Sequence, residues 1–230
     1  MAPELRRFHG RRLARPLTRR RKELLEHLLP RLRVPLPEQG TLDPRALFTA
    51  LPEEVWLEIG FGGGEHLAWQ AEHHPEIGFV GCEPFVNGLA TLLTTIEEKR
   101  LSNIRIHPDD ARLLLARLEP HSIGRCFILF PDPWPKARHK KRRIVSTETL
   151  DWLADAMRDG AELRLASDDA DYVQHMQEVA GTHAAFRAIR IDEATTRTRP
   201  SDWPATRYEE KALAKEASCR FLVYARKPRN

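Results

Sequence analysis

The sequence lacks a long hydrophobic run, since no stretch approaches the ~18 consecutive apolar residues that a membrane-spanning helix needs. We therefore expect neither a membrane span nor a membrane partner. Cysteine is scarce as well: Cys82, Cys126 and Cys219 are widely spaced and form no C-x-x-C pair. This pattern disfavours a disulfide framework and a zinc ribbon and fits a reducing compartment, so we expect a cytoplasmic protein. The ten histidines show no metal-ligand spacing, and no metal is expected.

The chain length suits one compact domain with modest extensions. It has 230 residues, and domains typically hold about 100–200. Hydrophobic residues make up 41% of the sequence, enough for a core, and the 30% of charged residues is ordinary for a globular protein. We expect a basic N-terminal arm with a short helix over residues 1–40, followed by a single domain over residues 41–230.

The net charge of +4 conceals two strongly basic segments. Residues 1–33 contain ten Arg and one Lys against three Glu, a balance of +8, and residues 136–143 contain six basic residues and no acid. Residues 34–135, which lie between them, carry seven basic and fifteen acidic residues, a balance of −8. Such clustering favours a phosphate-bearing partner over general solubility.

Each basic segment has other interpretations. A mitochondrial transit peptide is disfavoured because residues 1–40 contain no Ser, and a twin-arginine export signal at Arg6 and Arg7 is disfavoured because no apolar region follows. A disordered, solvating arm remains open and does not exclude contact with RNA. The second segment could be a nuclear-localisation signal or a solvated loop, which the prolines and tryptophan before it disfavour.

Short apolar runs alternate with amphipathic stretches along most of the chain. The runs expected to be strands are residues 55–60, 77–83, 104–107, 125–130, 161–167, 186–191 and 219–224. The stretches expected to be helices are residues 65–74, 86–100, 110–118, 146–158 and 169–180, with a further helix over 19–29 capped by Thr18. This alternation predicts an α/β fold: a Rossmann-like, doubly wound, mainly parallel sheet with helices on both faces.

A glycine-rich turn follows the first expected strand. Glycines at positions 60, 62 and 64 permit a tight turn and a close approach by a ligand. Glu83 ends the second strand, where a carboxylate is placed to accept from both hydroxyls of a ribose. A glycine turn with a distant acid fits either a dinucleotide or S-adenosylmethionine.

Glu58 separates these two ligands. It lies just before the first glycine, and the turn is not G-x-G-x-x-G. A carboxylate there would repel a diphosphate but attract an ammonium or sulfonium cation. Asp110, or its neighbour Asp109, follows the third strand and could accept from an adenine amino group. Each of these acids could instead be a helix cap or a turn residue, but three at successive strand ends favour a ligand site.

The fourth expected strand ends in a stiff loop, Pro131 to Lys136, with the sequence PDPWPK. Its prolines restrict the backbone and fix the directions of Asp132 and Trp134. An indole and a carboxylate at a strand's carboxyl end suit a flat base. The base can stack on the indole and donate hydrogen bonds to the carboxylate. The basic run that follows would neutralise RNA phosphates.

At this point the sequence resembles the bacterial tRNA (guanine-N7-)-methyltransferases, which are S-adenosylmethionine-dependent enzymes of the class I fold. The resemblance rests on LEIGFGGGEHL (57–67), GCEPF (81–85), FPDPWPKARHKKRR (130–143), ASDDADY (166–172) and RPSDWPATRYEEKAL (199–213). It covers roughly residues 55–225. PDPWPK and the late TRYE are its specific signatures. The sequence departs from the family pattern at two places. Residues 216–218 stand where the family commonly has a glycine-containing turn, and Lys140 stands where it often has a second His.

The resemblance implies that residues 41–230 form a methyltransferase domain that methylates N7 of the variable-loop guanine, position 46, in tRNA. It implies a methyl-donor site of Glu58, Gly60, Gly62, Glu83, Asp110 and Asp132, with Asp132 also catalytic. It implies substrate contacts by Lys136, Asp168, Thr206, Arg207, Tyr208 and Glu209. It further implies RNA contacts by Arg138, His139, Lys140, Lys141, Arg142 and Arg143. Which carboxylate faces the guanine stays open.

Glu58 and the glycine turn also bear on the competing functions. A nicotinamide-dependent oxidoreductase is disfavoured by Glu58 and by the turn sequence, whereas another RNA base methyltransferase or a catalytically silent RNA-binding relative remains an alternative. We expect no obligate protein partner and a monomer or weak homodimer. Cys82 and Cys126 are expected to be buried small side chains. His66, His73 and His74 are expected on a surface helix, in structural or solvated roles.

Overall fold

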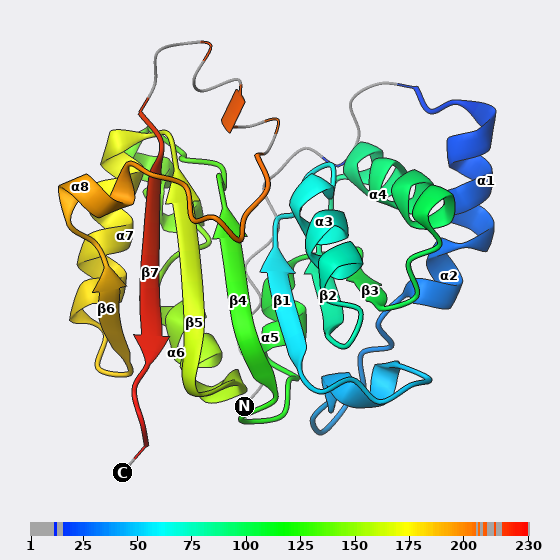
Figure 1. Ribbon diagram of the computed structural model, residues 1–230, viewed down its shortest axis with the longest axis horizontal. Coiled ribbons are helices and arrows are strands. Elements are labelled where there is room, and N and C mark those ends of the chain that lie inside the picture. Colours follow the sequence, from blue (N-terminus) through cyan, green and yellow to red (C-terminus); the bar gives the residue numbers. More distant parts are fainter. Residues whose placement is uncertain are drawn as a thin grey trace.

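A seven-stranded sheet between two layers of helices forms the computed structural model of the chain (Figure 1). The strands run in the order β3-β2-β1-β4-β5-β7-β6. Their bounds are β1 Val55–Ile59, β2 Gly78–Cys82, β3 Ile104–His107, β4 Ile123–Leu129, β5 Met157–Ser167, β6 Phe186–Arg190 and β7 Arg220–Arg226. The structure describes Arg12, residues 16–205, Arg207, Glu209, Glu210, Ala214 and residues 218–229.

The first five strands are parallel, and β7 pairs antiparallel with both β5 and β6. This arrangement confirms the doubly wound, mainly parallel sheet. The expected strands are present, and the largest difference is that β5 begins at Met157 rather than at residue 161. The extension exists because Met157 pairs with Ile123 across an irregular stretch of β4 and β5.

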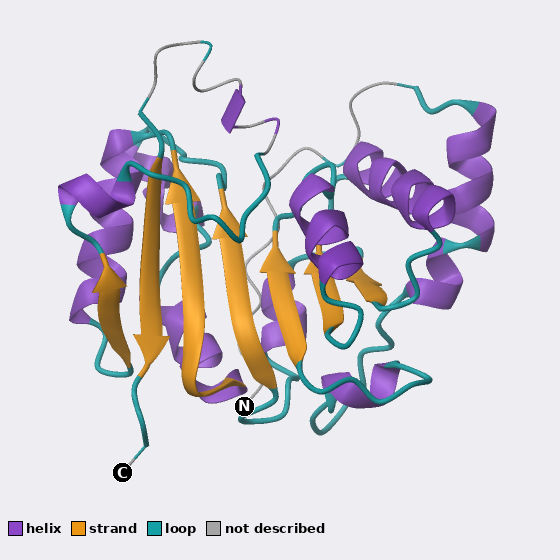
Figure 2. Ribbon diagram, in the orientation of Figure 1, coloured by secondary structure: helices purple, strands orange, loops and turns teal. Residues whose placement is uncertain are grey.

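Helices α3 to α7 connect the strands as the amphipathic stretches predict, whereas α8, between β6 and β7, was not expected (Figure 2). Their bounds are α1 Arg19–His27, α2 Leu29–Leu32, α3 Glu65–His73, α4 Val86–Lys99, α5 Ala111–Leu115, α6 Thr147–Ala156, α7 Ala170–Thr182 and α8 Glu193–Thr196. Short 3-10 helices span η1 Pro44–Leu47 and η2 Ala137–Arg142. The Thr18 side chain caps α1 by accepting from the Arg21 backbone N–H, as expected.

The two faces of the sheet bury separate hydrophobic cores. Leu57 points to one core with α5, α6 and α7, while its neighbour Trp56 points to the other with α1, α3 and α4, because successive side chains of a strand face opposite sides. Phe79 and Phe127 extend the second core along β2 and β4. Cys82 and Cys126 are buried in the strands, as expected, and burial raises the pKa of both thiols.

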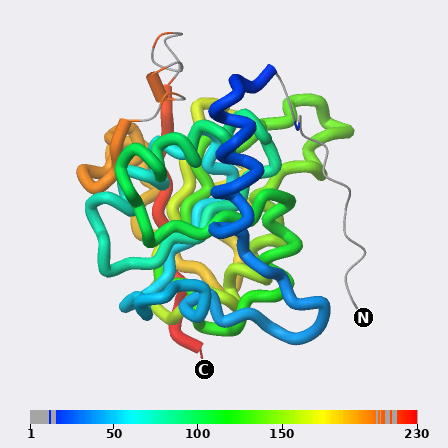
Figure 3. Tube along the Cα trace, turned by 90° about the vertical axis from the view of Figure 1, so that its right-hand side faces the viewer, coloured from blue at the N-terminus to red at the C-terminus, as the bar shows by residue number. Residues whose placement is uncertain are grey.

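The described part of the N-terminal arm is packed onto the domain. Leu24 is buried between α1 and the rest of the second core, and Arg20 pairs with Glu97 of α4. The chain then reaches the edge of the sheet, where the Val34 backbone N–H donates to the Ile106 carbonyl of β3 at 2.9 Å. Figure 3 shows α1, in blue, on the outside of this flank. Over the described residues, the helices are too short or too polar to cross a membrane.

The first turn of α4 lies against the glycine turn that follows β1. A Cβ atom added at Gly88 would lie 2.1 Å from the carbonyl oxygen of Gly62, far inside van der Waals contact. Only glycine at position 88 permits this approach. The position of the glycine turn therefore depends on the packing of α4.

Replacing Gly88 by Ala should lower the free energy of unfolding by about 1–3 kcal/mol, the usual penalty for overpacking. Gly181→Ala is the matched control, because a Cβ atom at that α7 glycine would meet no atom within 4 Å. Alanine there should be neutral or stabilise by up to ~1 kcal/mol. Urea-induced unfolding measures both variants, and an unchanged midpoint for Gly88→Ala would contradict the close approach.

Candidate active site

The carboxyl ends of five parallel strands meet at one edge of the sheet, shown at the top of Figure 1. The order of the strands reverses between β1 and β4. The helix that follows β1, α3, packs on one face, and the helix that follows β4, α6, packs on the other. Ligands of doubly wound sheets bind in the crevice at such a reversal. The glycine turn, Glu83, Asp110, the PDPWPK loop and Asp168 each follow the carboxyl end of one of these strands.

The turn after β1 has room for a ligand. Gly60, Gly62 and Gly64 have φ angles of 77°, 56° and 80°, which L side chains rarely adopt. A Cβ atom at Gly60 would meet nothing within 4 Å. Among the described residues, no side chain caps the start of α3, whereas at the start of α4 the Val86 N–H already donates to the Arg12 carbonyl at 2.8 Å. A polar ligand could therefore approach the backbone closely at Gly60.

Glu83 lies at the end of β2 and holds the glycine turn. Its buried carboxylate accepts from the backbone N–H groups of Gly62 at 2.8 Å and Phe85 at 2.9 Å. Burial raises the pKa of Glu83 to about 7, and the negative charges of Asp132 and Glu58 add to this rise, while the two N–H bonds oppose it. The structure thus brings three of the predicted donor-site carboxylates within electrostatic reach of one another.

Glu58 is buried in β1, directly before the turn. Its Oε2 atom lies 2.7 Å from Nδ1 of His66 in α3. Of the two roles expected for His66, structural or solvated, the solvated one is wrong: only 3% of His66 is exposed, because α3 packs that face against β1 and β4. His73, on the outer face of the same helix, is exposed as expected.

The third strand end presents two carboxylates with different partners. Asp110 caps α5, accepting from the Arg112 backbone N–H at 3.0 Å, and pairs with the Arg112 side chain. Asp109 is more exposed, and it accepts from the Asp110 backbone N–H and from Arg12 at 2.8 Å. The capping role considered for these acids is therefore present at Asp110. Which of the two contacts adenine stays a prediction.

The loop after β4 has a strained backbone. Phe130 and Trp134 have φ angles of 50° and 45°, and such conformations of non-glycine residues concentrate at functional sites. The Asp132 carboxylate is open to solvent, yet the surrounding protein partly desolvates it and so raises its pKa. The Arg142 guanidinium lies over the Trp134 ring, 4.9 Å from its centre. One indole face is therefore already covered.

The basic segment 136–143 is folded onto α7. Lys140 and Arg143 both pair with Asp171, which lowers the pKa of that carboxyl to about 2. The predicted RNA contact by Arg143 is wrong for this structure, since only 1% of Arg143 is exposed. Its guanidinium lies over the Tyr172 ring and its Nε donates to the Pro133 carbonyl. The other side chains of the segment reach the surface to differing extents, and Lys136, Arg138 and Lys141 are the exposed ones.

The predicted substrate residues that the structure describes come from several separate segments. Asp168, at the end of β5, is exposed. Glu209 is buried and pairs with Arg199 at 3.1 Å. Burial raises the pKa of Cys219 to about 11, and the negative charges of Glu209 and Asp168 add to this rise. Both carboxylates therefore lie near Cys219, the residue before β7. Arg207 pairs with Glu65 at the start of α3, 3.1 Å away. Thr206 and Tyr208 lie outside the described residues.

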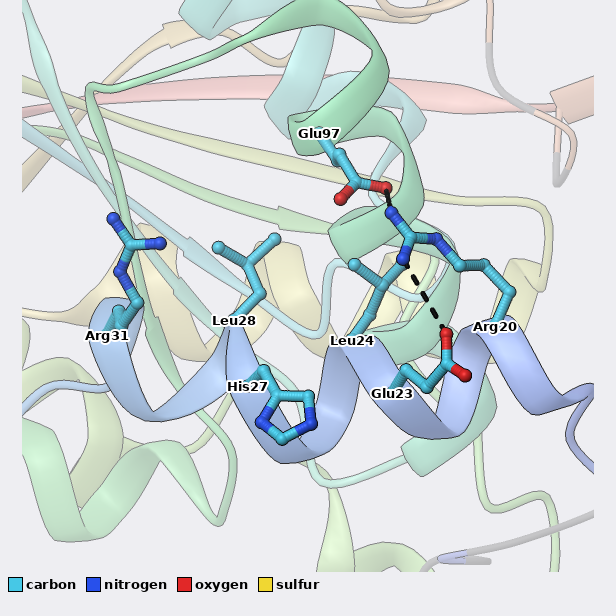
Figure 4. A pocket seen from close by; sticks show the side chains of 7 residues that line it. All are labelled: Arg20, Glu23, Leu24, His27, Leu28, Arg31 and Glu97. Atoms are coloured by element: carbon cyan, nitrogen blue, oxygen red, sulfur yellow. Dashed lines mark hydrogen bonds and ion pairs between the residues drawn. The ribbon is translucent and has the colours of Figure 1, made fainter.

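A cavity of about 320 Å³ lies elsewhere, between α1 and α4 (Figure 4). Arg20 spans it to reach Glu97 and Glu23, and Leu24 and Leu28 line its floor. None of the predicted site residues lines this cavity. In the part of the chain that the structure describes, no group of three or more His, Cys, Asp or Glu side chains is arranged to hold a metal ion.

Comparison with known proteins adds to this geometry. A family described as "Putative methyltransferase" matches residues 52–221. The chain is 49% identical to the tRNA (guanine-N(7)-)-methyltransferase of Paramagnetospirillum magneticum, over 99% of this chain and 96% of that protein. It is 46% identical to the protein of the same name from Rhodospirillum rubrum, over 97% of this chain and 89% of that protein.

Among solved structures, the 16S rRNA (adenine(1408)-N(1))-methyltransferase of Catenulisporales acidiphilia aligns with a TM-score of 0.53 at 17% identity. The alignment covers 82% of this chain and 94% of that one. At this identity the likeness supports the fold alone, and the fold is that of the class I methyltransferases. With nearly full-length identities above 45% to two curated relatives, the chain belongs to the tRNA (guanine-N(7)-)-methyltransferase family.

Proposed function

We propose that the chain transfers a methyl group from S-adenosylmethionine to N7 of the variable-loop guanine, position 46, in tRNA. The observation that carries the proposal is the group of carboxylates beside the open glycine turn, on a chain of this family. Glu58 and Glu83 are held there by an imidazole and by backbone N–H groups rather than by Lys or Arg. Their negative charge therefore remains available to a cation.

The residues at the glycine turn fit this methyl donor. Gly60 leaves space for close approach, Glu83 can accept from ribose hydroxyls, and Glu58 provides charge for the amino acid portion or the sulfonium. Asp110 or Asp109 serves the adenine. S-adenosylmethionine supplies a methyl group already activated by the positively charged sulfur. The chain's task is to bind and orient this donor beside Asp132.

The chemistry at guanine needs positioning more than proton transfer. N7 carries an in-plane lone pair and no proton, so no general base has to act before attack. Holding the lone pair in line with the methyl–sulfur bond lowers the barrier by orientation. As the bond to sulfur breaks, the purine acquires positive charge, which Asp132, Asp168 or Glu209 can stabilise by accepting from the base. We assign Asp132 this catalytic role.

The RNA surface joins the basic segment and the residues after β5. Lys136, Asp168, Arg207 and Glu209, with Thr206 and Tyr208, are the proposed substrate contacts. Arg138, His139, Lys140, Lys141 and Arg142 are the proposed phosphate contacts, from which Arg143 is removed because it is buried. An enzyme that acts on tRNA works where tRNA is, so we propose a cytoplasmic location. A monomer or weak homodimer stays the expected assembly.

Methyl transfer from labelled S-adenosylmethionine to unmodified tRNA transcripts tests the proposal directly. Cleavage chemistry specific for N7-methylguanine should cut at the variable-loop guanine, and a transcript with adenine at that position should not be cut. Label without this cleavage would make the chain a different RNA base methyltransferase. No label despite donor binding would make it a silent RNA-binding relative.

The affinity for S-adenosylhomocysteine should rise roughly tenfold between pH 6 and pH 8, as Glu83 ionises through its pKa of about 7. The sign follows from the raised pKa: the carboxylate that accepts ribose hydroxyls forms only as the pH rises. Isothermal titration across this range measures it. Glu83→Gln should bind more weakly at pH 8 and lose the pH dependence, and a retained dependence would assign it to another group.

Asp132→Asn should reduce kcat roughly 100-fold, the scale expected when one electrostatic contact to the transition state is removed. The dissociation constant for S-adenosylhomocysteine should change far less, because Asp132 is one of several carboxylates at the donor site. Asp151→Asn, an exposed carboxylate on α6, is the matched control. Single-turnover methylation measures the rate. A wild-type rate for Asp132→Asn with donor binding unchanged would refute the catalytic role.

A further inference from the structure

A line of buried polar side chains connects the donor site with the segment that leads into the TRYE motif. Oε2 of Glu58 lies 2.7 Å from Nδ1 of His66, and Nε2 of His66 lies 3.2 Å from the amide nitrogen of Gln70. That nitrogen also donates to the backbone carbonyl of Asp202 at 2.8 Å. Glu58, His66 and Gln70 are 3%, 3% and 1% exposed.

The far end of the line fixes the direction of every hydrogen bond. The Asp202 carbonyl can only accept, so the Gln70 amide must turn its nitrogen towards it. The same nitrogen faces Nε2 of His66, which must therefore be the unprotonated acceptor. The imidazole proton then resides on Nδ1 and is donated to Glu58, which accepts as a carboxylate. The imidazole is neutral and leaves the charge of Glu58 in place.

The segment at the far end is held firmly in position. The Asp202 carboxylate pairs with Arg164 of β5 at 2.7 Å. The next residue, Trp203, is 2% exposed and packs its ring against Phe127 of β4, Phe221 of β7 and the imidazole of His66. Figure 1 shows this segment, in orange, crossing the sheet near the carboxyl end of β4. His66 therefore touches the segment directly and through Gln70.

We infer that His66 is a positioning residue for methyl transfer. It orients the charged carboxylate of Glu58 towards the donor, and through Gln70 it holds the 199–205 segment that continues into Arg207 and Glu209. The inference rests on the proposed function and deepens it. Its physical content is that one imidazole serves two sites, with Nδ1 acting on donor binding and Nε2 acting on tRNA binding.

Packing alone does not account for these polar side chains. Leu67, Ala68 and Ala71 show that the same helix buries apolar residues, so an apolar side chain would be the simpler filling at positions 66 and 70. Instead, the Oε1 atom of Gln70 is buried without a hydrogen-bond partner among the described residues. An unsatisfied buried acceptor destabilises the folded protein. The polar side chains of this line are present in spite of that penalty. Their presence favours a role in binding.

Two substitutions separate the two nitrogens of the imidazole. Asn at position 66 can place its amide nitrogen near Nδ1 and donate to Glu58, but it does not reach Gln70. Gln at position 66 reaches towards Gln70 instead. H66Q should weaken S-adenosylhomocysteine binding about tenfold, the loss of one hydrogen bond to a charged group, while H66N should stay within about threefold of wild type. Isothermal titration of the full-length chain measures both without requiring turnover.

The other half of the line is tested through tRNA. Gln70→Met keeps the side-chain volume and removes the bonds to His66 and Asp202. This variant and H66N should raise KM for tRNA about threefold to tenfold with kcat within about twofold, because one or two neutral hydrogen bonds are lost. If H66Q fails to fold in a thermal melt, Gln70→Met still tests the link. His73→Asn and His73→Gln, on the exposed face of α3, are the matched controls and should match wild type.

The outcomes distinguish this inference from the proposed function. Equal weakening of S-adenosylhomocysteine binding by H66N and H66Q, or no weakening by either, would overturn the positioning role of Nδ1. An unchanged KM for tRNA in Gln70→Met would overturn the link to the 199–205 segment. Absence of S-adenosylhomocysteine binding and of methyl transfer in the wild type would instead overturn the proposed function itself.

Discussion

The site depends on holding several carboxylates close together without neutralising them. The reversal of strand order between β1 and β4 brings Glu58, Glu83 and Asp132 to one crevice, where they repel one another. Paired Arg or Lys side chains would relieve the repulsion but would also cancel the charge. Glu83 accepts from backbone N–H groups and Glu58 from a neutral imidazole. Both buried carboxyl groups thus have hydrogen-bond partners that carry no positive charge.

The basic segment follows the opposite rule. Asp171 binds Lys140 and Arg143, and Trp134 receives Arg142 over its ring. These contacts use part of the positive charge to fix the shape of the loop that carries Asp132. Lys136 and Arg138, in the same segment, are exposed. The same short stretch thus holds the loop that carries Asp132 and also contains the proposed RNA contacts, and its buried member, Arg143, serves only to hold the loop.

Most of the fold was predictable because its signals are local. Apolar runs gave the strands, the glycine spacing gave the turn, and Thr18 gave the start of α1. The roles of His66 and Arg143 were not predictable, since each depends on partners distant in the sequence. Gln70, which contacts His66, binds the carbonyl of Asp202, 132 residues away. Arg143 pairs with Asp171, 28 residues away. From the sequence pattern alone, a polar residue in an amphipathic helix is predicted to be exposed, because its distant partners are not known.

Helix α3 links the two halves of the site. Its first residue, Glu65, pairs with Arg207 of the TRYE motif, while Gln70, one and a half turns later, binds the Asp202 carbonyl. The helix begins at the glycine turn, so the backbone that meets the donor and the side chains that hold the substrate segment belong to one rigid element. Helix α3 therefore contacts the substrate segment at two separate points, Arg207 and the Asp202 carbonyl. Under the proposed function, this shared support is what would couple the donor site to the tRNA site.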